Sequence, residues 1–221
     1  MAEVVAIAGE SGSGKSTSIR DLNPEETYLI NTSGKNLPFK GSAKLYNVEK
    51  KNYYEPKGIL DVLNKLKVVS DKAPHVKQII IDDSNYLQTF NMMDKALETG
   101  YTKFTLLARD IVTLIQEAKK LRPDLIIYYI THTETVMDGD EISGYKLKTI
   151  GKMLDNQVVM EGLFTIILYA YIETKGDDST YYFLTNKVGR MPAKSPNEMF
   201  AEKKIPNNLQ LVSDTIREYY N

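Results

Sequence analysis

The fold is decided by the stretch Gly9-Glu10-Ser11-Gly12-Ser13-Gly14-Lys15-Ser16. It fits the pattern G-x-x-x-x-G-K-[ST] and follows the apolar run Val4-Val5-Ala6-Ile7-Ala8, which predicts a buried strand. Residues 16–20 can begin a helix behind it. A strand, a glycine-rich loop and a helix in this order are the context in which the pattern marks a phosphate-binding loop rather than an ordinary glycine turn.

Each part of this loop has a chemical role toward phosphate. The glycines let the backbone curl so that its N–H groups point inward, and the positive end of the following helix favours the same anion. Lys15 can reach the β- and γ-phosphates, and the Ser16 hydroxyl can coordinate Mg²⁺, a hard cation that prefers oxygen. The sequence therefore predicts a site for ATP with Mg²⁺. The residues expected to bind the nucleotide are Gly9, Glu10, Ser11, Gly12, Ser13, Gly14, Lys15, Ser16 and Thr17.

The composition is that of a soluble globular protein. Of the 221 residues, 42% are hydrophobic and 26% are charged, the net charge is −1, and cysteine is absent. Any DNA binding must therefore come from a local patch, and disulfides and thiolate metal sites are excluded. No apolar run is long enough to span a bilayer, and the N-terminus lacks the basic segment of a signal peptide. We expect one domain over residues 1–221, in the cytoplasm and without a membrane partner.

A second strand signal ends in two acids. Gln78-Ile79-Ile80-Ile81-Asp82-Asp83 begins as a short β-branched run of the kind that is buried on both faces of a parallel sheet. Ligands of such sheets sit beyond the carboxyl ends of the strands, so Asp82 is expected beside the phosphate-binding loop, holding Mg²⁺ through water or through Ser16. Asp83 could then orient or deprotonate the attacking water. The alternative is a strand followed by an Asp-Asp-Ser-Asn turn.

A third buried strand, residues 125–131, is followed by His132. This position would also face the nucleotide, which makes His132 a candidate sensor of the γ-phosphate; the alternative is a structural histidine. The polar stretch 133–149 is predicted to be a long loop, and such loops are usually functional or disordered. We expect its basic half to contact single-stranded DNA. The lysines concerned are Lys146, Lys148 and the nearby Lys152.

The last part of the chain predicts an antiparallel hairpin and a closing helix. Two runs, 163–172 and 180–185, flank a turn at Gly176-Asp177-Asp178-Ser179, which implies a connection of about four or five residues. Further helices are expected over residues 59–69, 86–98, 101–121 and 208–220. The predicted fold class is α/β, a P-loop NTPase with a mainly parallel central sheet, flanking helices and a C-terminal antiparallel β-hairpin.

Segment 32–57 carries lysines between tyrosines, a pattern that could hold a nucleic-acid backbone and stack bases. Charge runs are more often solvated faces. We therefore expect a loop whose Tyr46, Tyr53 and Tyr54 pack back on the domain.

Four further segments are distinctive. They are Gly34-Lys35-Asn36-Leu37-Pro38-Phe39, Gly151-Lys152-Met153-Leu154-Asp155, Glu161-Gly162-Leu163-Phe164-Thr165 and Ala193-Lys194-Ser195-Pro196-Asn197-Glu198-Met199-Phe200. The order of the motifs above resembles the RecA-like branch of P-loop ATPases. With these segments, nearly the whole chain is similar to the phage-encoded single-domain RecA-like ATPases, AAA-family ATP-binding proteins of which some act as single-strand annealing proteins in recombination.

The resemblance implies a core-only RecA-like fold, Mg-ATP hydrolysis and binding of single-stranded DNA through the loop after the sensor strand. It implies that Asp82 is the Walker B acid and His132 the sensor. Lys187 and Arg190 follow the last strand and would reach the γ-phosphate of a neighbouring copy in a homo-oligomeric ring or filament. A solvated basic turn is the alternative. A phage single-stranded-DNA-binding protein is a further expected partner.

Two departures from this family pattern bear on hydrolysis and assembly. RecA-like enzymes usually place a glutamate at the end of the strand after the P-loop helix, whereas here that strand ends Ile30-Asn31-Thr32. The base is then Asp83, or hydrolysis is slow. No polymerisation arm precedes the first strand, which leaves open whether a filament forms.

Three functions fit these observations. We expect a DNA-stimulated ATPase that acts in annealing or recombination. A small-molecule nucleotide phosphotransferase is disfavoured because the arginines are scattered instead of forming a lid cluster. A nucleotide-dependent assembly switch with little hydrolysis is the third possibility, and the missing glutamate favours it.

Overall fold

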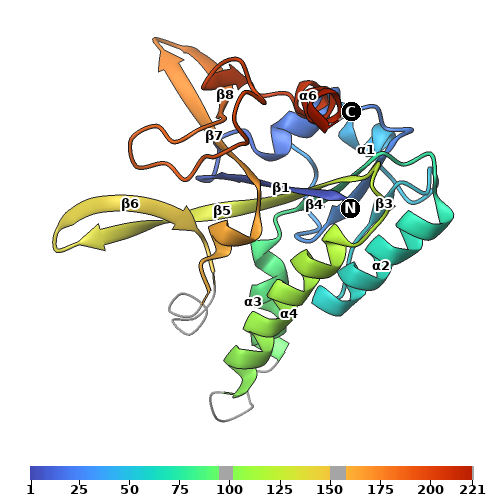
Figure 1. Ribbon diagram of the computed structural model, residues 1–221. Helices are drawn as coiled ribbons and strands as arrows, with labels where there is room; N and C mark the ends of the chain where they lie inside the picture. The colour runs from blue at the N-terminus through green and yellow to red at the C-terminus, as the bar shows by residue number, and fades with distance from the viewer. Residues whose placement is uncertain (95–101, 150–157, 221) are drawn as a thin grey trace.

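The computed structural model describes residues 1–94, 102–149 and 158–220. The strands that run parallel to one another are β1 (Glu3–Gly9), β2 (Thr27–Asn31), β3 (Tyr53–Tyr54), β4 (Gln78–Asp82), β5 (Ile126–Asp138) and β7 (Ile166–Lys175). The antiparallel additions are β6 (Glu141–Leu147), β8 (Asp178–Leu184) and β9 (Lys204–Pro206). The sheet has the order β3-β2-β4-β5-β1-β7-β8-β9, and β6 pairs with β5 outside this path (Figure 1). The predicted α/β class with a mainly parallel sheet is confirmed.

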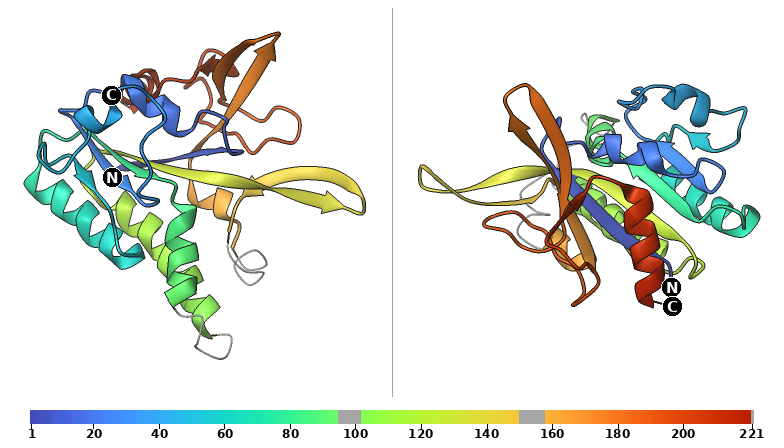
Figure 2. Two further views of the ribbon diagram at one scale, coloured as in Figure 1. Left: turned by 180° about the vertical axis from the view of Figure 1, so that it is seen from behind. Right: turned by 90° about the horizontal axis from the view of Figure 1, so that it is seen from above.

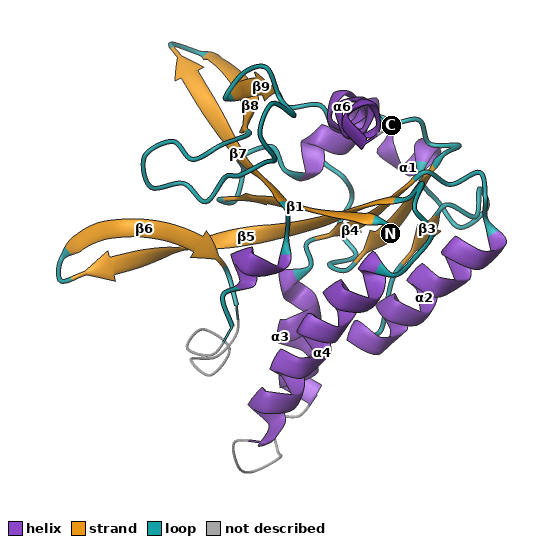
Figure 3. Cartoon of the chain, in the orientation of Figure 1, coloured by secondary structure: helices purple, strands orange, loops and turns teal. Residues whose placement is uncertain are grey.

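Helices cover both faces of this sheet (Figures 2 and 3). One face carries α2 (Ile59–Lys72), α3 (Asn85–Asp94) and α4 (Thr102–Lys119), and the other carries α6 (Leu209–Tyr220), α1 (Ser42–Leu45) and the 3₁₀ helix η1 (Ser16–Asp21). A second 3₁₀ helix, η2 (Met160–Leu163), precedes β7. Within the described residues, no helix has both the length and the apolarity that crossing a membrane requires.

The central strands are apolar without alternation because both of their faces are covered. Every residue of β2 and β4 is buried. Ile79 and Ile81 belong to the apolar cluster beneath α2 and α4, whereas Ile80 belongs to the cluster beneath α6. A strand between two such cores has no solvent face on which polar residues would be favoured.

The polar stretch 133–149 contains a β-hairpin, and the expectation of a long loop is wrong. β5 continues to Asp138 and returns as β6 through Gly139-Asp140, with pairs from Thr133↔Leu147 to Asp138↔Glu141. Most of the side chains in its outer part are exposed, so no apolar face marks these strands in the sequence. We call this element the β5–β6 hairpin; its tip carries acids rather than lysines.

The predicted C-terminal hairpin is present as β7 and β8, with a tighter turn than expected. Lys175 pairs with Asp178, so only Gly176-Asp177 connects the strands, and Gly176 has a φ of +60°. The two hairpins project from the same side of the molecule and diverge (Figure 1).

Two short strands lie in segments expected to be irregular. In segment 32–57, β3 pairs with β2, Tyr46 is only 4% exposed, and Tyr53 and Tyr54 pack against the apolar cores. The expectation that these tyrosines pack back on the domain is confirmed. β9 adds to the sheet edge and ends at Pro206, a residue that an edge strand tolerates because it needs no N–H there.

Helix α6 is held to the sheet by a buried polar contact as well as by apolar packing. The Tyr128 hydroxyl lies 2.7 Å from Ser213 Oγ and donates to the Leu209 carbonyl at 3.4 Å. Tyr128 and Ser213 are both fully buried, so neither hydroxyl has water as a substitute partner.

Replacement of Tyr128 by Phe is expected to lower the free energy of unfolding by about 1–2 kcal/mol, because the Ser213 hydroxyl loses its partner inside the protein. Adding Ser213→Ala should recover part of this loss, since neither side of the contact is then polar. Urea unfolding of the wild type, both single variants and the double variant measures the coupling. Strictly additive losses would contradict this account.

Candidate nucleotide-binding site

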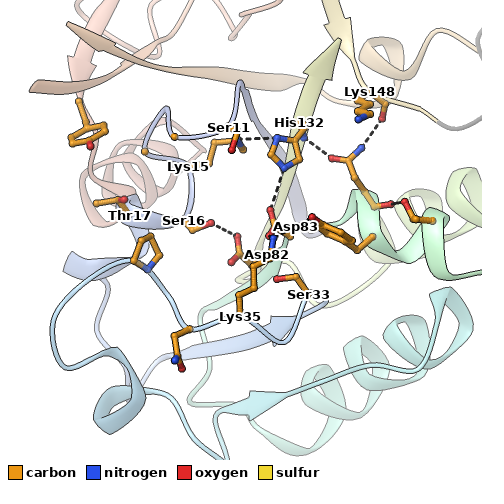
Figure 4. A pocket seen from close by; sticks show the side chains of 18 residues that line it. Ser11, Lys15, Ser16, Thr17, Ser33, Lys35, Asp82, Asp83, His132 and Lys148 are labelled. Atoms are coloured by element: carbon orange, nitrogen blue, oxygen red, sulfur yellow. Dashed lines mark hydrogen bonds and ion pairs between the residues drawn. The ribbon is translucent and has the colours of Figure 1, made fainter. Parts of the chain in front are cut away.

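The predicted site residues meet at the carboxyl edge of the parallel strands. β5 lies between β1 and β4, and Gly9 at the end of β1 pairs with His132 on β5. A pocket of about 800 Å³ opens at this edge (Figure 4). It is lined by Lys15, Ser16, Asp82, Asp83 and His132, so the structure brings together residues from three separate stretches of sequence.

The phosphate-binding loop forms one wall of the pocket. Of the nine residues predicted to bind nucleotide, six line it: Ser11, Gly12, Gly14, Lys15, Ser16 and Thr17. Gly14 has a φ of +92°, and a Cβ there would lie 2.5 Å from a ring carbon of Tyr181 on β8. Glycine is therefore required at this position both for its backbone conformation and for space.

The other three predicted residues, Gly9, Glu10 and Ser13, do not line the pocket. The Lys15 ammonium donates to the carbonyls of Gly9 at 3.0 Å and Glu10 at 2.7 Å. The Ser13 hydroxyl is buried and has no hydrogen-bond partner within the described part of the chain.

The helix that follows the loop is a six-residue 3₁₀ helix. It is too short to develop the full macrodipole of a longer α-helix. Phosphate binding by this loop would therefore depend more on the loop N–H groups and on Lys15.

Ser16 and Asp82 form the predicted metal pair. Ser16 Oγ donates to Asp82 Oδ1 at 2.8 Å, and both side chains line the pocket. Hydroxyl and carboxylate oxygens are the donors that Mg²⁺ prefers. Among the described residues there is no cluster of three or more histidine or acidic side chains arranged to hold a metal ion. A Mg²⁺ ion at Ser16 and Asp82 would therefore take its other ligands from phosphate oxygens and water.

The charges of the pocket fit such a ligand. Burial raises the pKa of Asp82 to about 7, and the charge of Asp83 adds to the rise. Burial likewise lowers the pKa of Lys15 to about 8, although the nearby acids oppose this effect. Both ionised forms are thus incompletely stabilised by the protein alone. A metal cation at Asp82 and a phosphate at Lys15 would supply the missing opposite charges.

Asp83 and His132 form a second pair next to Lys15. His132 Nε2 lies 3.5 Å from Asp83 Oδ1, and the Lys15 ammonium lies 3.4 Å from His132 Nδ1 (Figure 4). The hydrogen bond from His132 holds the pKa of Asp83 below its usual range. In the neutral imidazole this arrangement places the proton on Nε2 and leaves Nδ1 to accept from Lys15. Asp83 has a φ of +55°, a left-handed conformation that aspartate tolerates better than most residues.

Thr32, just after β2, contacts the backbone of Asp82 and Asp83, and no further acid stands at the end of this strand. The Thr32 hydroxyl lies within hydrogen-bond distance of the backbone carbonyls of Asp82, at 2.7 Å, and Asp83, at 2.6 Å. Asn31 donates to the Lys35 carbonyl and to the Tyr53 hydroxyl. The position where a glutamate was expected is thus occupied by groups that fix the backbone of the acidic pair.

Eight lining residues of the pocket were not among the predicted site residues: Ser33, Lys35, Asn36, Pro38, Asn85, Tyr86, Thr89 and Tyr181. Lys35 lies 3.9 Å from Asp83 and also contacts Tyr86, and Tyr181 reaches the loop from β8. Asn85 holds both His132 and Lys148. The only sequence signal for Asn85 was its place two residues after Asp83, in a stretch that also fits an ordinary turn.

The remaining predicted residues lie in two places on the molecule or outside the described residues. Lys148 lines the nucleotide pocket. Lys146 pairs with Glu134 at 3.0 Å on the β5–β6 hairpin. Lys187 and Arg190 are exposed and lie outside the pocket of their own chain, beside Lys146 in a second pocket. Lys152 lies outside the described residues.

Replacement of Asp82 by Asn is expected to stabilise the ligand-free protein at pH 8 more than at pH 5. The raised pKa means that the folded state binds the Asp82 proton more tightly than the unfolded state does. This contribution to stability is lost as the pH rises through about 7. The gain at pH 8 should be on the order of 1–2 kcal/mol. Chemical unfolding at both pH values measures it.

Asp83→Asn is the matched control with the opposite sign. A lowered pKa stabilises the folded state at every pH above the ordinary value for aspartate. The Asp83 variant should therefore be less stable than the wild type at both pH values. Stabilisation by Asp83→Asn, or a pH-independent effect of Asp82→Asn, would contradict the assignment.

Comparison with known proteins agrees with this geometry. Residues 1–197 match the AAA_24 family, described as an AAA domain. No curated protein matches the chain. Among solved structures, the chain is similar to the crystal structure of a KaiC-like protein from the hyperthermophilic archaeon Pyrococcus horikoshii OT3. The TM-score is 0.56 and the identity 15%, over 91% of this chain and 83% of that chain, a likeness that shows the fold.

The family match spans most of the chain and includes the phosphate-binding loop, Asp82 and Asp83. The family implies a bound nucleotide, usually with Mg²⁺, which is the ligand that the pocket fits. The chain belongs to the AAA domain family and is a P-loop ATPase.

Proposed function

We propose that this ATPase hydrolyses Mg-ATP, binds single-stranded DNA and promotes annealing or recombination in phage DNA metabolism. The observation that carries the ATPase part is the Ser16–Asp82 contact beside the buried Lys15. The DNA part rests on the sequence resemblance and on a basic surface described below.

Different pocket residues have different roles in the proposed phosphoryl transfer. Lys15 and the loop N–H groups hold the phosphates, and Ser16 and Asp82 hold Mg²⁺, which neutralises developing charge on the phosphates. Asp83 lies one residue beyond Asp82 and carries a low pKa, so it is ionised and can orient the attacking water. His132 contacts both Lys15 and Asp83 and is placed to sense whether a γ-phosphate is present.

One observation favours slow hydrolysis and supports the assembly-switch alternative. Asp83 is already engaged by His132 at 3.5 Å and approached by Lys35 at 3.9 Å, and a carboxylate with a low pKa is a weak base. A nucleotide-dependent switch would bind ATP tightly and turn it over rarely.

Lys15→Ala is expected to reduce ATP turnover by about 100-fold or more, because it removes the charge that contacts the transferred phosphate. Phosphate release is measured for this variant and the wild type, each with and without single-stranded DNA. Lys40→Ala is the matched control, since Lys40 is exposed and lies outside the pocket lining.

A rise in wild-type turnover with DNA supports the proposed function. Tight ATP binding with no turnover under either condition favours the switch. Measurable turnover that is equal in the wild type and in Lys15→Ala would contradict both functions.

A second pocket, of about 600 Å³, offers a surface for the DNA strand. It lies where the β5–β6 hairpin meets residues 187–194, and four of its lining residues are basic: Lys146, Lys187, Arg190 and Lys194. Glu161 is the one acid among its described lining residues. Tyr145 in the same wall offers a ring on which a base can stack. Basic side chains around an aromatic ring are typical of sites that follow a phosphate backbone.

Lys187 and Arg190 also suit the alternative role in an oligomer. Both are exposed and outside the pocket of their own chain, so they would reach a nucleotide only in a neighbouring copy. A homo-oligomeric ring or filament is therefore part of the proposal, and a phage single-stranded-DNA-binding protein is a proposed partner.

The double variant Lys187→Glu/Arg190→Glu separates these two roles. If the residues line the DNA site, affinity for a labelled oligonucleotide should fall at least about tenfold, and the salt dependence of binding should weaken by about one to two phosphate contacts. Lys57→Glu/Lys72→Glu is the charge-matched control, since both lysines are exposed and lie outside the two pockets. If the residues serve a neighbouring nucleotide instead, turnover without DNA falls and DNA affinity is kept. An unchanged affinity with unchanged turnover would exclude both roles.

A further inference from the structure

Asn85 occupies the junction between the nucleotide pocket and the β5–β6 hairpin. It is the first residue of α3, directly after the segment that carries the acids, and is 7% exposed. Its Oδ1 accepts from the Thr131 hydroxyl at 2.8 Å and from the His132 backbone N–H at 2.5 Å. Its Nδ2 donates to the Lys148 carbonyl at 2.9 Å (Figure 4).

These partners fix the orientation of the Asn85 amide. The His132 N–H can only donate, and the Lys148 carbonyl can only accept. If the amide were flipped, its Nδ2 would face the His132 N–H, and its Oδ1 would face the Lys148 carbonyl. Leaving either group without a partner inside the protein is unfavourable, so the amide is held in this one orientation.

The hydrogen bonds of Asn85 join the nucleotide pocket to the β5–β6 hairpin. The His132 ring touches Lys15 and Asp83 in the pocket. Lys148 follows the last residue of β6, and its own N–H donates to the His132 carbonyl at 2.8 Å. Asn85 therefore closes a ring of hydrogen bonds between the residue that faces the phosphates and the returning strand of the hairpin.

We propose that Asn85 is a positioning residue that holds His132 toward the γ-phosphate and makes the β5–β6 hairpin respond to the bound nucleotide. A shift of the His132 backbone on nucleotide binding moves the Asn85 amide and, through it, the Lys148 carbonyl. The inference rests on the proposed ATP-dependent function, and it assigns to that function the path by which the pocket reaches the surface where DNA is proposed to bind.

Asn85→Asp tests this path with a nearly isosteric change. The carboxylate still accepts from Thr131 and His132, but it cannot donate to Lys148 and repels that carbonyl. Thr131→Val is a second, uncharged variant that removes one of the two donors holding the amide. Asn91→Asp makes the same substitution on the same helix at a residue outside the pocket lining.

The measurement is hydrogen exchange of β6 with and without the magnesium complex of a non-hydrolysable ATP analogue, together with analogue affinity and steady-state kinetics. In the wild type and in Asn91→Asp, the analogue should slow exchange of β6 by about threefold or more. In Asn85→Asp, measured at a saturating concentration of the analogue, this difference should fall to less than about half. Thr131→Val should lie between, and kcat should fall more than KM changes.

Four results overturn the inference. One is a wild-type β6 that shows no nucleotide-dependent exchange, and another is an Asn85→Asp variant that retains the full difference. The third is loss of the difference in Asn91→Asp as well. A wild type that binds the analogue and never hydrolyses ATP refutes the proposed hydrolysis, yet the exchange difference still decides the role of Asn85. A wild type that binds no analogue refutes both.

Discussion

The hydrogen bond from Ser16 to Asp82 joins the loop after β1 to the end of β4 across the intervening β5. It can form only because these strands are parallel and end at the same edge of the sheet. The strand that it crosses is the one that carries His132. Next to this pair lie the contacts of Thr32 with the backbone of the acids and the Asp83–His132 pair.

The buried charged groups of the pocket lower the stability of the ligand-free protein, and a bound nucleotide with its metal would offset this loss. A buried carboxylate and a buried ammonium are both held where their charged forms are disfavoured. The two apolar cores on either side of the sheet keep this arrangement rigid. Nucleotide and metal bring the opposite charges, so binding should stabilise the folded protein as well as fill the site.

The pocket is connected to the hairpins as well as to the core. Tyr181 on β8 touches the phosphate-binding loop, and Lys148 after β6 lines the pocket. Both hairpins therefore contact the nucleotide pocket, and both project from the same side of the molecule (Figure 1). The basic pocket beside Tyr145 lies where one of them meets residues 187–194, which places the proposed DNA surface next to an element that contacts the nucleotide site.

The sequence by itself determined the class of fold and the identity of the phosphate-binding loop. Residues 4–16 combine an unbroken apolar run with glycine spacing that few other structures require, and residues 78–83 repeat the apolar run before two acids. These signals are local, because a strand buried on both faces must be continuously apolar and a loop around phosphate must contain glycine. His132 was identified in the same way, from its place after a buried strand.

Tertiary structure alone decided the rest. The stretch 133–149 has no apolar face because its outer strands are solvated, so its pairing depends on register with β5 and not on composition. Asn85 and Tyr181 have no distinctive spacing, and their roles come from contacts with residues 47 and 167 positions away. Hydrogen bonds between distant segments leave no periodic signal in a single chain, whereas apolar burial and positive φ do, and this difference decides which parts of the site could be predicted.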